Sequence, residues 1–116
     1  MASTATVAVA IHGCDGDKSF VEVGGGNVEG VASLHKHLID AGYPSLLAPI
    51  LRSGRSERNF INLAQQKGVQ IELSVGFRRS LFPGFPNTMQ RTPGEFKRFV
   101  RCMYTWLLEL EKQFER

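Results

Sequence analysis

The sequence predicts an α/β fold: a small, mainly parallel sheet with helices packed on it, with a mixed sheet as the alternative. Short runs of apolar, β-branched residues at 6–11 and 69–75 are typical of strands. Apolar residues at helical spacing occupy residues 28–40 and the C-terminal stretch that begins near residue 94. Strands that alternate with helices favour a parallel sheet covered by those helices.

The length and composition fit a single domain over residues 1–116. The chain is 42% hydrophobic and 22% charged, close to the average for globular proteins. It contains no apolar run near the roughly 20 residues that a membrane-spanning helix needs. The apolar start at residues 7–11 is too short for the core of a signal peptide, so we expect a cytoplasmic protein without a membrane segment.

The net charge of +3 is mild and favours an anionic ligand over a cationic one. Nucleic-acid binders usually carry a denser basic surface, and here only Arg52, Arg55 and Arg58 cluster, so nucleic acid is not an expected partner. Cys14 and Cys102 form no spaced metal motif, and we expect two free thiols.

In the first half of the chain, the strand at 6–11 ends in His12-Gly13, and a short extended piece follows at 20–23. Asn27 is suited to cap a helix over 28–40, and a second strand is expected at 45–50. The residues expected to form the buried stripe of this helix are Val28, Val31, Ala32, His35, Leu38 and Ile39.

In the second half, a short helix is expected at 59–66, an alternating strand at 69–75 and a loop at 82–89. Thr92-Pro93-Gly94-Glu95 is a capping box that begins the final helix. Its expected apolar stripe comprises Phe96, Phe99, Val100, Met103, Trp106, Leu107, Leu110 and Phe114.

His12 directly follows an apolar strand, and functional sites in open α/β sheets lie beyond the carboxyl ends of strands. A neutral imidazole there can bind zinc or act as a base. The alternative is a hydrogen-bonded histidine with a structural role.

Glu72 lies in the middle of an otherwise apolar strand, where burying an unpaired carboxylate is costly. It therefore points to a polar cleft, in which it could serve as a general base. The alternative is an edge strand whose polar face is simply hydrated.

Arg78 and Arg79 follow the Glu72 strand, and their guanidinium groups could hold a carboxylate. Ordinary surface charge is the alternative. The Gly24-Gly25-Gly26 turn before a helix could bind an anion through backbone N–H groups, or could be a tight turn without a chemical role.

Several of these pieces together resemble the poly-γ-glutamate hydrolase family known first from phage, which has a zinc carboxypeptidase-like fold. The resemblance rests on His12-Gly13, Val23-Gly24-Gly25, Asn59-Phe60-Ile61-Asn62, and the stretch 67–74 followed by Arg78-Arg79. It covers most of this chain but only about the C-terminal half of the family's domain.

The resemblance implies roles for four residues. His12 falls on the family's third zinc ligand, and Glu72 falls on the glutamate that looks like the general base. Arg78 and Arg79 fall on an arginine pair suited to grip an anionic γ-glutamyl polymer.

The family's other two zinc ligands lie upstream in a His-Ala-Gly-Gly-Ile-Glu type of motif, which this sequence does not contain. A catalytic zinc normally needs three protein ligands, so a homodimer mate or a complementing chain would have to complete the site. Amide hydrolysis with zinc is the first hypothesis. The second is a non-catalytic α/β remnant that dimerises, because missing strands leave a sheet edge exposed, and that binds an anionic ligand or a protein partner.

Overall fold

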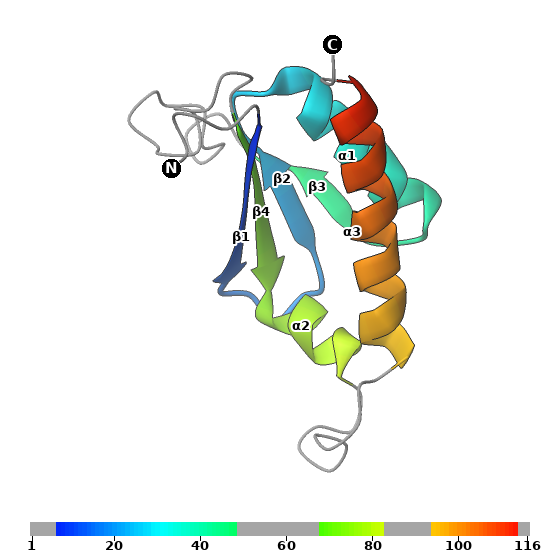
Figure 1. The fold of residues 1–116 in the computed structure, drawn as a ribbon. Coiled ribbons are helices and arrows are strands. Elements are labelled where there is room, and N and C mark those ends of the chain that lie inside the picture. The colour runs from blue at the N-terminus through cyan, green and yellow to red at the C-terminus, as the bar shows by residue number, and fades with distance from the viewer. Residues whose placement is uncertain (1–6, 49–67, 83–93, 114–116) are drawn as a thin grey trace.

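The computed structural model describes residues 7–48, 68–82 and 94–113, and within them four strands and three helices (Figure 1). In chain order these elements are β1 (Ala8–Cys14), β2 (Val21–Gly24), α1 (Val28–Asp40), β3 (Ser45–Leu47), β4 (Gly68–Ser74), α2 (Val75–Leu81) and α3 (Gly94–Gln113).

The four strands form one sheet in the order β1-β4-β2-β3. β1 is parallel to β4 and β2 is parallel to β3, but β2 runs antiparallel to β4. The sheet is therefore mixed, the alternative that the sequence left open. A short turn after β1 sends β2 back in the opposite direction, and the antiparallel pairing of β2 with β4 follows from that reversal.

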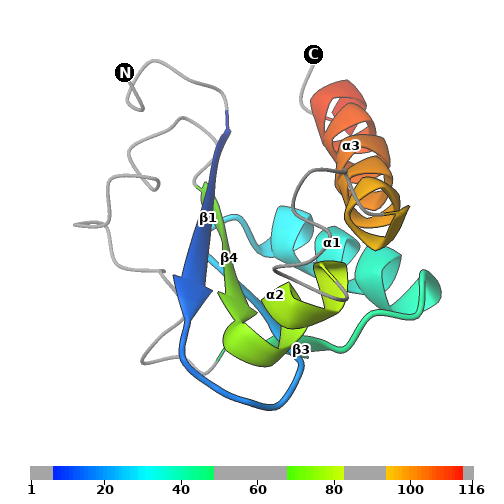
Figure 2. The same cartoon turned by 90° about the horizontal axis from the view of Figure 1, so that it is seen from below.

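The helices α1 and α3 cover one face of the sheet (Figure 2). The core between them includes Val69 and Ile71 of β4, Leu34 of α1 and Trp106 of α3, all with no exposed surface. Because side chains alternate along a strand, Gln70 and Glu72 project from the other face of β4. The sheet thus has an apolar face under the helices and a face that carries the polar residues.

α1 has the expected bounds and cap, since the Asn27 side chain accepts a hydrogen bond of 2.8 Å from the Gly30 N–H. Its buried residues are Gly30, Leu34 and Leu38, whereas Val28 is 62% exposed, so the expected buried stripe is only partly correct. A Cβ added to Gly30 would lie 3.0 Å from Cγ2 of Val69. The helix is therefore turned so that its glycine makes the closest approach to the sheet.

α2 was not expected from the sequence, which favoured a strand to residue 75 and a loop at 82–89 and assigned no element to residues 76–81. Ser74 ends β4 and caps α2, because its Oγ accepts a 3.0 Å hydrogen bond from the N–H of Phe77. The same hydroxyl donates to the carbonyl of Lys18 at 2.8 Å. Ser74 thus ties the end of β4 to the turn between β1 and β2.

α3 begins and ends close to the expected residues, and it buries Phe99, Met103, Trp106 and Leu110. Two members of its expected apolar stripe are instead well exposed, Val100 at 46% and Leu107 at 40%. None of the helices among the described residues is long and apolar enough to cross a membrane. The expected helix at 59–66, Asn59, Asn62 and the Arg52–Arg58 cluster lie outside the described residues.

Candidate active site

The strand register brings three ionisable side chains into one row on the face of the sheet opposite the helices. His12 of β1 is the register partner of Glu72 of β4, and Glu72 is the register partner of Glu22 of β2. Directly opposite residues on neighbouring strands share a face, with Cβ atoms about 5 Å apart. The two residues singled out from the sequence, His12 and Glu72, are therefore neighbours in space.

His12 and Glu72 are in electrostatic contact. Nδ1 of His12 lies 3.6 Å from Oε1 of Glu72, and the same oxygen accepts a 3.3 Å hydrogen bond from Nε2 of Gln70. The His12 side chain is 48% exposed and that of Glu72 is 24% exposed. A fixed carboxylate that solvent can reach, beside an imidazole, is suited to accept a proton from a bound water.

Glu22 is the site residue that the sequence reasoning missed. It is only 8% exposed, and its strand neighbours Val21 and Val23 are fully buried. A carboxylate between two buried valines is the same signal that drew attention to Glu72. It was overlooked because β2 has only four residues, too few to show an alternating pattern.

The pKa of the Cys14 thiol is affected by the charges of this region. Burial raises its pKa, and the negative charges of Glu72 and then Glu22 raise it further. The cysteine is free, as the sequence predicted, and remains a neutral thiol near neutral pH. Cys14 is therefore unsuited to act as a nucleophile, and both carboxylates act on the same end of the sheet.

Arg78 does not join this row. Its Nη2 donates to the carbonyl of Cys14 at 3.2 Å, and a Cβ added to Gly13 would lie 3.0 Å from its guanidinium carbon. Successive side chains along β1 point to opposite faces of the sheet, so a Cβ on Gly13, the residue after His12, would point to the face that the helices cover. The guanidinium group consequently lies at the carboxyl end of β1, on the face opposite to His12 and Glu72.

Arg79 is held only loosely, with Nη1 at 3.9 Å from a carboxylate oxygen of Asp17 and both side chains largely exposed. Arg78 and Arg79 line an open pocket of about 450 Å³ together with Val75 and Phe82. The arginine pair thus forms a separate basic pocket on α2, beyond the end of the sheet.

The glycine turn before α1 has a packing role. Gly25 has φ of 131°, and a Cβ there would lie 2.2 Å from the carbonyl oxygen of Gly68. The N–H of Asn27 donates to the same oxygen at 3.0 Å. A glycine is required because the chain crosses β4 at this point, which accounts for Gly25 without an anion.

A zinc ion does not fit the site that the described residues form. Zinc in a catalytic site takes three protein ligands, and His12 with Glu72 offers at most two adjacent side chains. Among residues 7–48, 68–82 and 94–113, no group of three or more His, Cys, Asp or Glu side chains could hold a metal ion. The described residues therefore do not form a complete zinc site.

Comparisons with known proteins show the family to which the chain belongs. Residues 1–102 match the sequence model of the family described as poly-gamma-glutamate hydrolase. YndL of Bacillus subtilis (strain 168) is 33% identical over 104 residues, which cover 85% of this chain and 41% of YndL.

Two solved structures share the fold. Zinc-free YndL matches with a TM-score of 0.78 and 30% identity, over 87% of this chain and 52% of that one. A bacteriophage poly-gamma-glutamate hydrolase matches with a TM-score of 0.82 and 25% identity, over 93% of this chain and 55% of that one. The chain thus spans about half the length of the proteins that it matches.

Proposed function

Because the chain belongs to the poly-gamma-glutamate hydrolase family, we propose that it supplies the proton-accepting part of a site that hydrolyses γ-linked glutamate polymer. The observation that carries this proposal is the contact between His12 and Glu72 across β1 and β4. The chain spans about half of its solved relatives, so the complete reaction needs groups from outside the described residues.

Glu72 is the proposed general base. Its carboxylate takes a proton from the water that attacks the amide carbon and can then pass it to the departing amine. Within the described residues, the hydrogen bond from Gln70 and the contact with His12 both reach Oε1, so Oε2 is the oxygen that we assign to the water. The exposed side of the carboxylate gives that water access.

His12 is the proposed contribution of this chain to metal binding. Its imidazole projects from the edge strand β1 and is half exposed, so it is open to a shared ligand sphere. The described residues lack the further ligands. We therefore propose zinc as a cofactor only where another polypeptide or another part of the protein provides them.

The experiment uses a chimera in which a related hydrolase provides the rest of the site. In the bacteriophage hydrolase, the section that matches residues 1–102 is replaced by those residues, and release of new amines from poly-γ-glutamate is followed. We expect Glu72→Gln to lower turnover by a factor of about 100 or more, because loss of a general base costs that much.

The matched control for the chimera is Glu95→Gln, a carboxylate on α3 whose ion pair among the described residues is with Arg98, one turn later at 3.7 Å. This variant is expected to turn over at the parent rate. Circular dichroism confirms that each chimera is folded. A folded Glu72→Gln chimera with undiminished turnover refutes the role of Glu72.

A second function, binding of an anionic ligand without turnover, is favoured by the basic pocket on α2. Arg79 is free to reorient because its ion pair with Asp17 is long and exposed. A γ-linked glutamate oligomer titrated into the chain is expected to bind, and Arg79→Gln is expected to weaken binding while Arg101→Gln on α3 does not. Equal affinities for the two variants would argue against this pocket.

A further inference from the structure

A second apolar stripe runs along α3 beside the face that the helix buries. The helix buries Phe99, Met103, Trp106 and Leu110 in the core. Its large exposed apolar residues are Val100 at 46%, Tyr104 at 60%, Leu107 at 40% and Leu108 at 42%. We call these four residues the α3 stripe. Three of them follow a buried residue by one position, and one position turns a helix by about 100°. The stripe therefore lies on one flank of the buried face.

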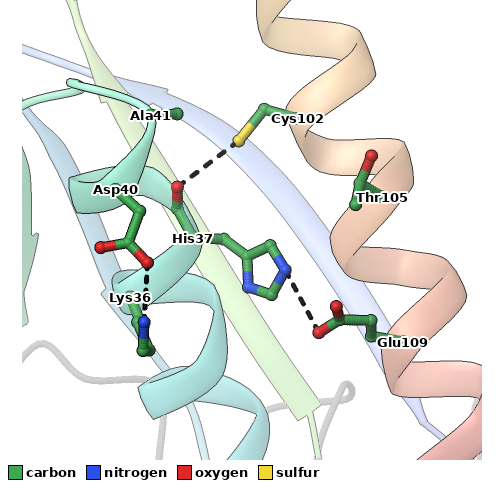
Figure 3. Close-up of a pocket in the computed structure, with 7 residues that line it drawn as sticks. All are labelled: Lys36, His37, Asp40, Ala41, Cys102, Thr105 and Glu109. Atoms are coloured by element: carbon green, nitrogen blue, oxygen red, sulfur yellow. Dashed lines mark hydrogen bonds and ion pairs between the residues drawn. The ribbon is translucent and has the colours of Figure 1, made fainter.

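The other flank of α3 faces α1. Cys102 and Glu109, each one position before a buried residue, contact His37 of α1: Cys102 Sγ donates to its carbonyl at 3.8 Å, and Glu109 lies 3.2 Å from its Nε2. Cys102, Thr105 and Glu109 line an open pocket of about 560 Å³ together with residues of α1. Figure 3 shows Cys102 and Glu109 pointing toward His37 of α1. The α3 stripe consequently points away from α1.

Most of this stripe lies beyond the residues that match the family's sequence model. The match to the family ends at residue 102, so Tyr104, Leu107 and Leu108 lie beyond it. Contiguous exposed apolar residues on a helix, flanked by charged ones, mark a surface that packs against another protein surface. Apolar residues spaced by three and four positions, as here, are the pattern of a helix that pairs with another helix.

The α3 stripe of one chain is complementary to the α3 stripe of a second, antiparallel chain. Val100 and Leu108 lie four positions before and after Tyr104, and Lys97 and Glu111 lie seven positions before and after it. An antiparallel second copy of α3, related by a two-fold axis at Tyr104, brings Val100 against the partner's Leu108. The same axis brings Lys97 against the partner's Glu111, so opposite charges meet at both ends of the seam.

We propose that the chain forms a homodimer through antiparallel packing of the α3 stripe. The second copy is the occupant that the pattern specifies, because one two-fold axis brings Val100 against Leu108 and Lys97 against Glu111. The same axis places Leu107 beside the partner's Arg101, whose aliphatic stem can cover it. A single helix pair buries less than the roughly 1,600 Å² of a standard interface, so the dimer dissociates in the micromolar range. Neither His12 nor Glu72 takes part, so this proposal and the proposed hydrolytic function stand or fall separately.

Sedimentation velocity across a micromolar concentration series tests the proposal on the purified chain. The wild type is expected to shift from monomer to dimer, and the double variant Tyr104→Glu/Leu108→Glu is expected to weaken dimerisation by a factor of about 10 or more, because it places charges in an apolar seam. The matched control is Leu46→Glu/Leu47→Glu on the edge strand β3, where the residues are 52% and 58% exposed. This control is expected to dimerise like the wild type.

Charge reversal tests the direction of the pairing. Lys97→Glu places like charges together at both ends of the seam and is expected to weaken the dimer, and adding Glu111→Lys is expected to restore it. A wild type that stays monomeric throughout the series overturns the proposal. So does a dimer that survives the stripe variant undiminished, or a charge reversal that the second substitution does not restore.

Discussion

At the scale of single residues, the pKa of the Cys14 thiol depends on the charge of Glu72, which lies on the face of the sheet opposite the helices. Burial raises the pKa of the thiol, and the Glu72 carboxylate is the next largest cause. Removing that negative charge with Glu72→Gln should lower the thiol pKa, increase the thiolate fraction and speed alkylation of Cys14 several-fold at mildly alkaline pH.

Alkylation of Cys14 by iodoacetamide is measured in a Cys102→Ser background, so that one thiol remains. Glu95→Gln, a distant carboxylate change, is the control and should leave the rate unaltered. An unchanged rate in Glu72→Gln would show that Glu72 does not act on the thiol, and would contradict the packing of the two residues at one end of the sheet.

The buried hydroxyl group of Tyr43 lowers the stability of the core. Its ring packs edge-to-face against Phe77 and Phe99, and its hydroxyl is the buried side-chain atom without a hydrogen-bond partner within the described residues. Desolvation raises its pKa, so the phenol stays neutral. Tyr43→Phe keeps the ring and removes the unpaired group, which should stabilise the fold by about 1 kcal/mol.

Thermal unfolding measures the effect of Tyr43→Phe as a melting temperature several degrees higher. Tyr104→Phe, at a position that is 60% exposed, is the control, and at protein concentrations too low for dimerisation it should leave the melting temperature unchanged. A melting temperature below that of the wild type would mean that the Tyr43 hydroxyl is satisfied in solution.

At the scale of elements, α2 depends on close contact with the turn between β1 and β2. A Cβ on Gly76 would lie 2.2 Å from the carbonyl oxygen of Asp17, and the N–H of Gly76 donates to Gly16 at 3.0 Å. Gly76→Ala should therefore lower the free energy of unfolding by about 1–3 kcal/mol, as other overpacking changes do.

Urea unfolding compares Gly76→Ala with Gly94→Ala. A Cβ on Gly94 would meet nothing within 4 Å, so the same chemical change there lacks the steric clash. Equal midpoints for the two variants would contradict the close packing of α2.

The long elements were predictable from sequence because hydrophobic periodicity is strong over 13 or 20 residues, as in α1 and α3. The seven residues of α2 are too few for such a signal, although Ser74 is a recognisable cap. The direction of β2 was not predictable, since pairing partners are chosen by tertiary packing. The rotation of α1 depended on the close approach at Gly30, which only the folded neighbours reveal.

The site was predictable in part. His12 and Glu72 each stood out as polar groups on apolar strands, but only the β1–β4 register makes them neighbours. Glu22 escaped because its strand is short. The position of Arg78 could not be predicted without α2. This helix directs the guanidinium group to the carbonyl of Cys14 and away from the sheet face that carries His12 and Glu72.

At the scale of the whole molecule, a small mixed sheet carries the residues that we propose for one side of a hydrolytic site. Among the described residues, β1 is an edge strand, and it carries His12, which is half exposed. The chain spans 52% and 55% of its two solved relatives. The groups that complete a metal site are therefore expected from a polypeptide segment outside the described residues.

The most direct test of this account is calorimetric titration of zinc into the purified chain, beside His12→Ala. Neither protein is expected to show saturable tight binding, because among the described residues His12 and Glu72 supply too few ligands. Saturable one-site binding to the wild type that His12→Ala abolishes would be the opposite result, and would mean that this chain completes its own metal site.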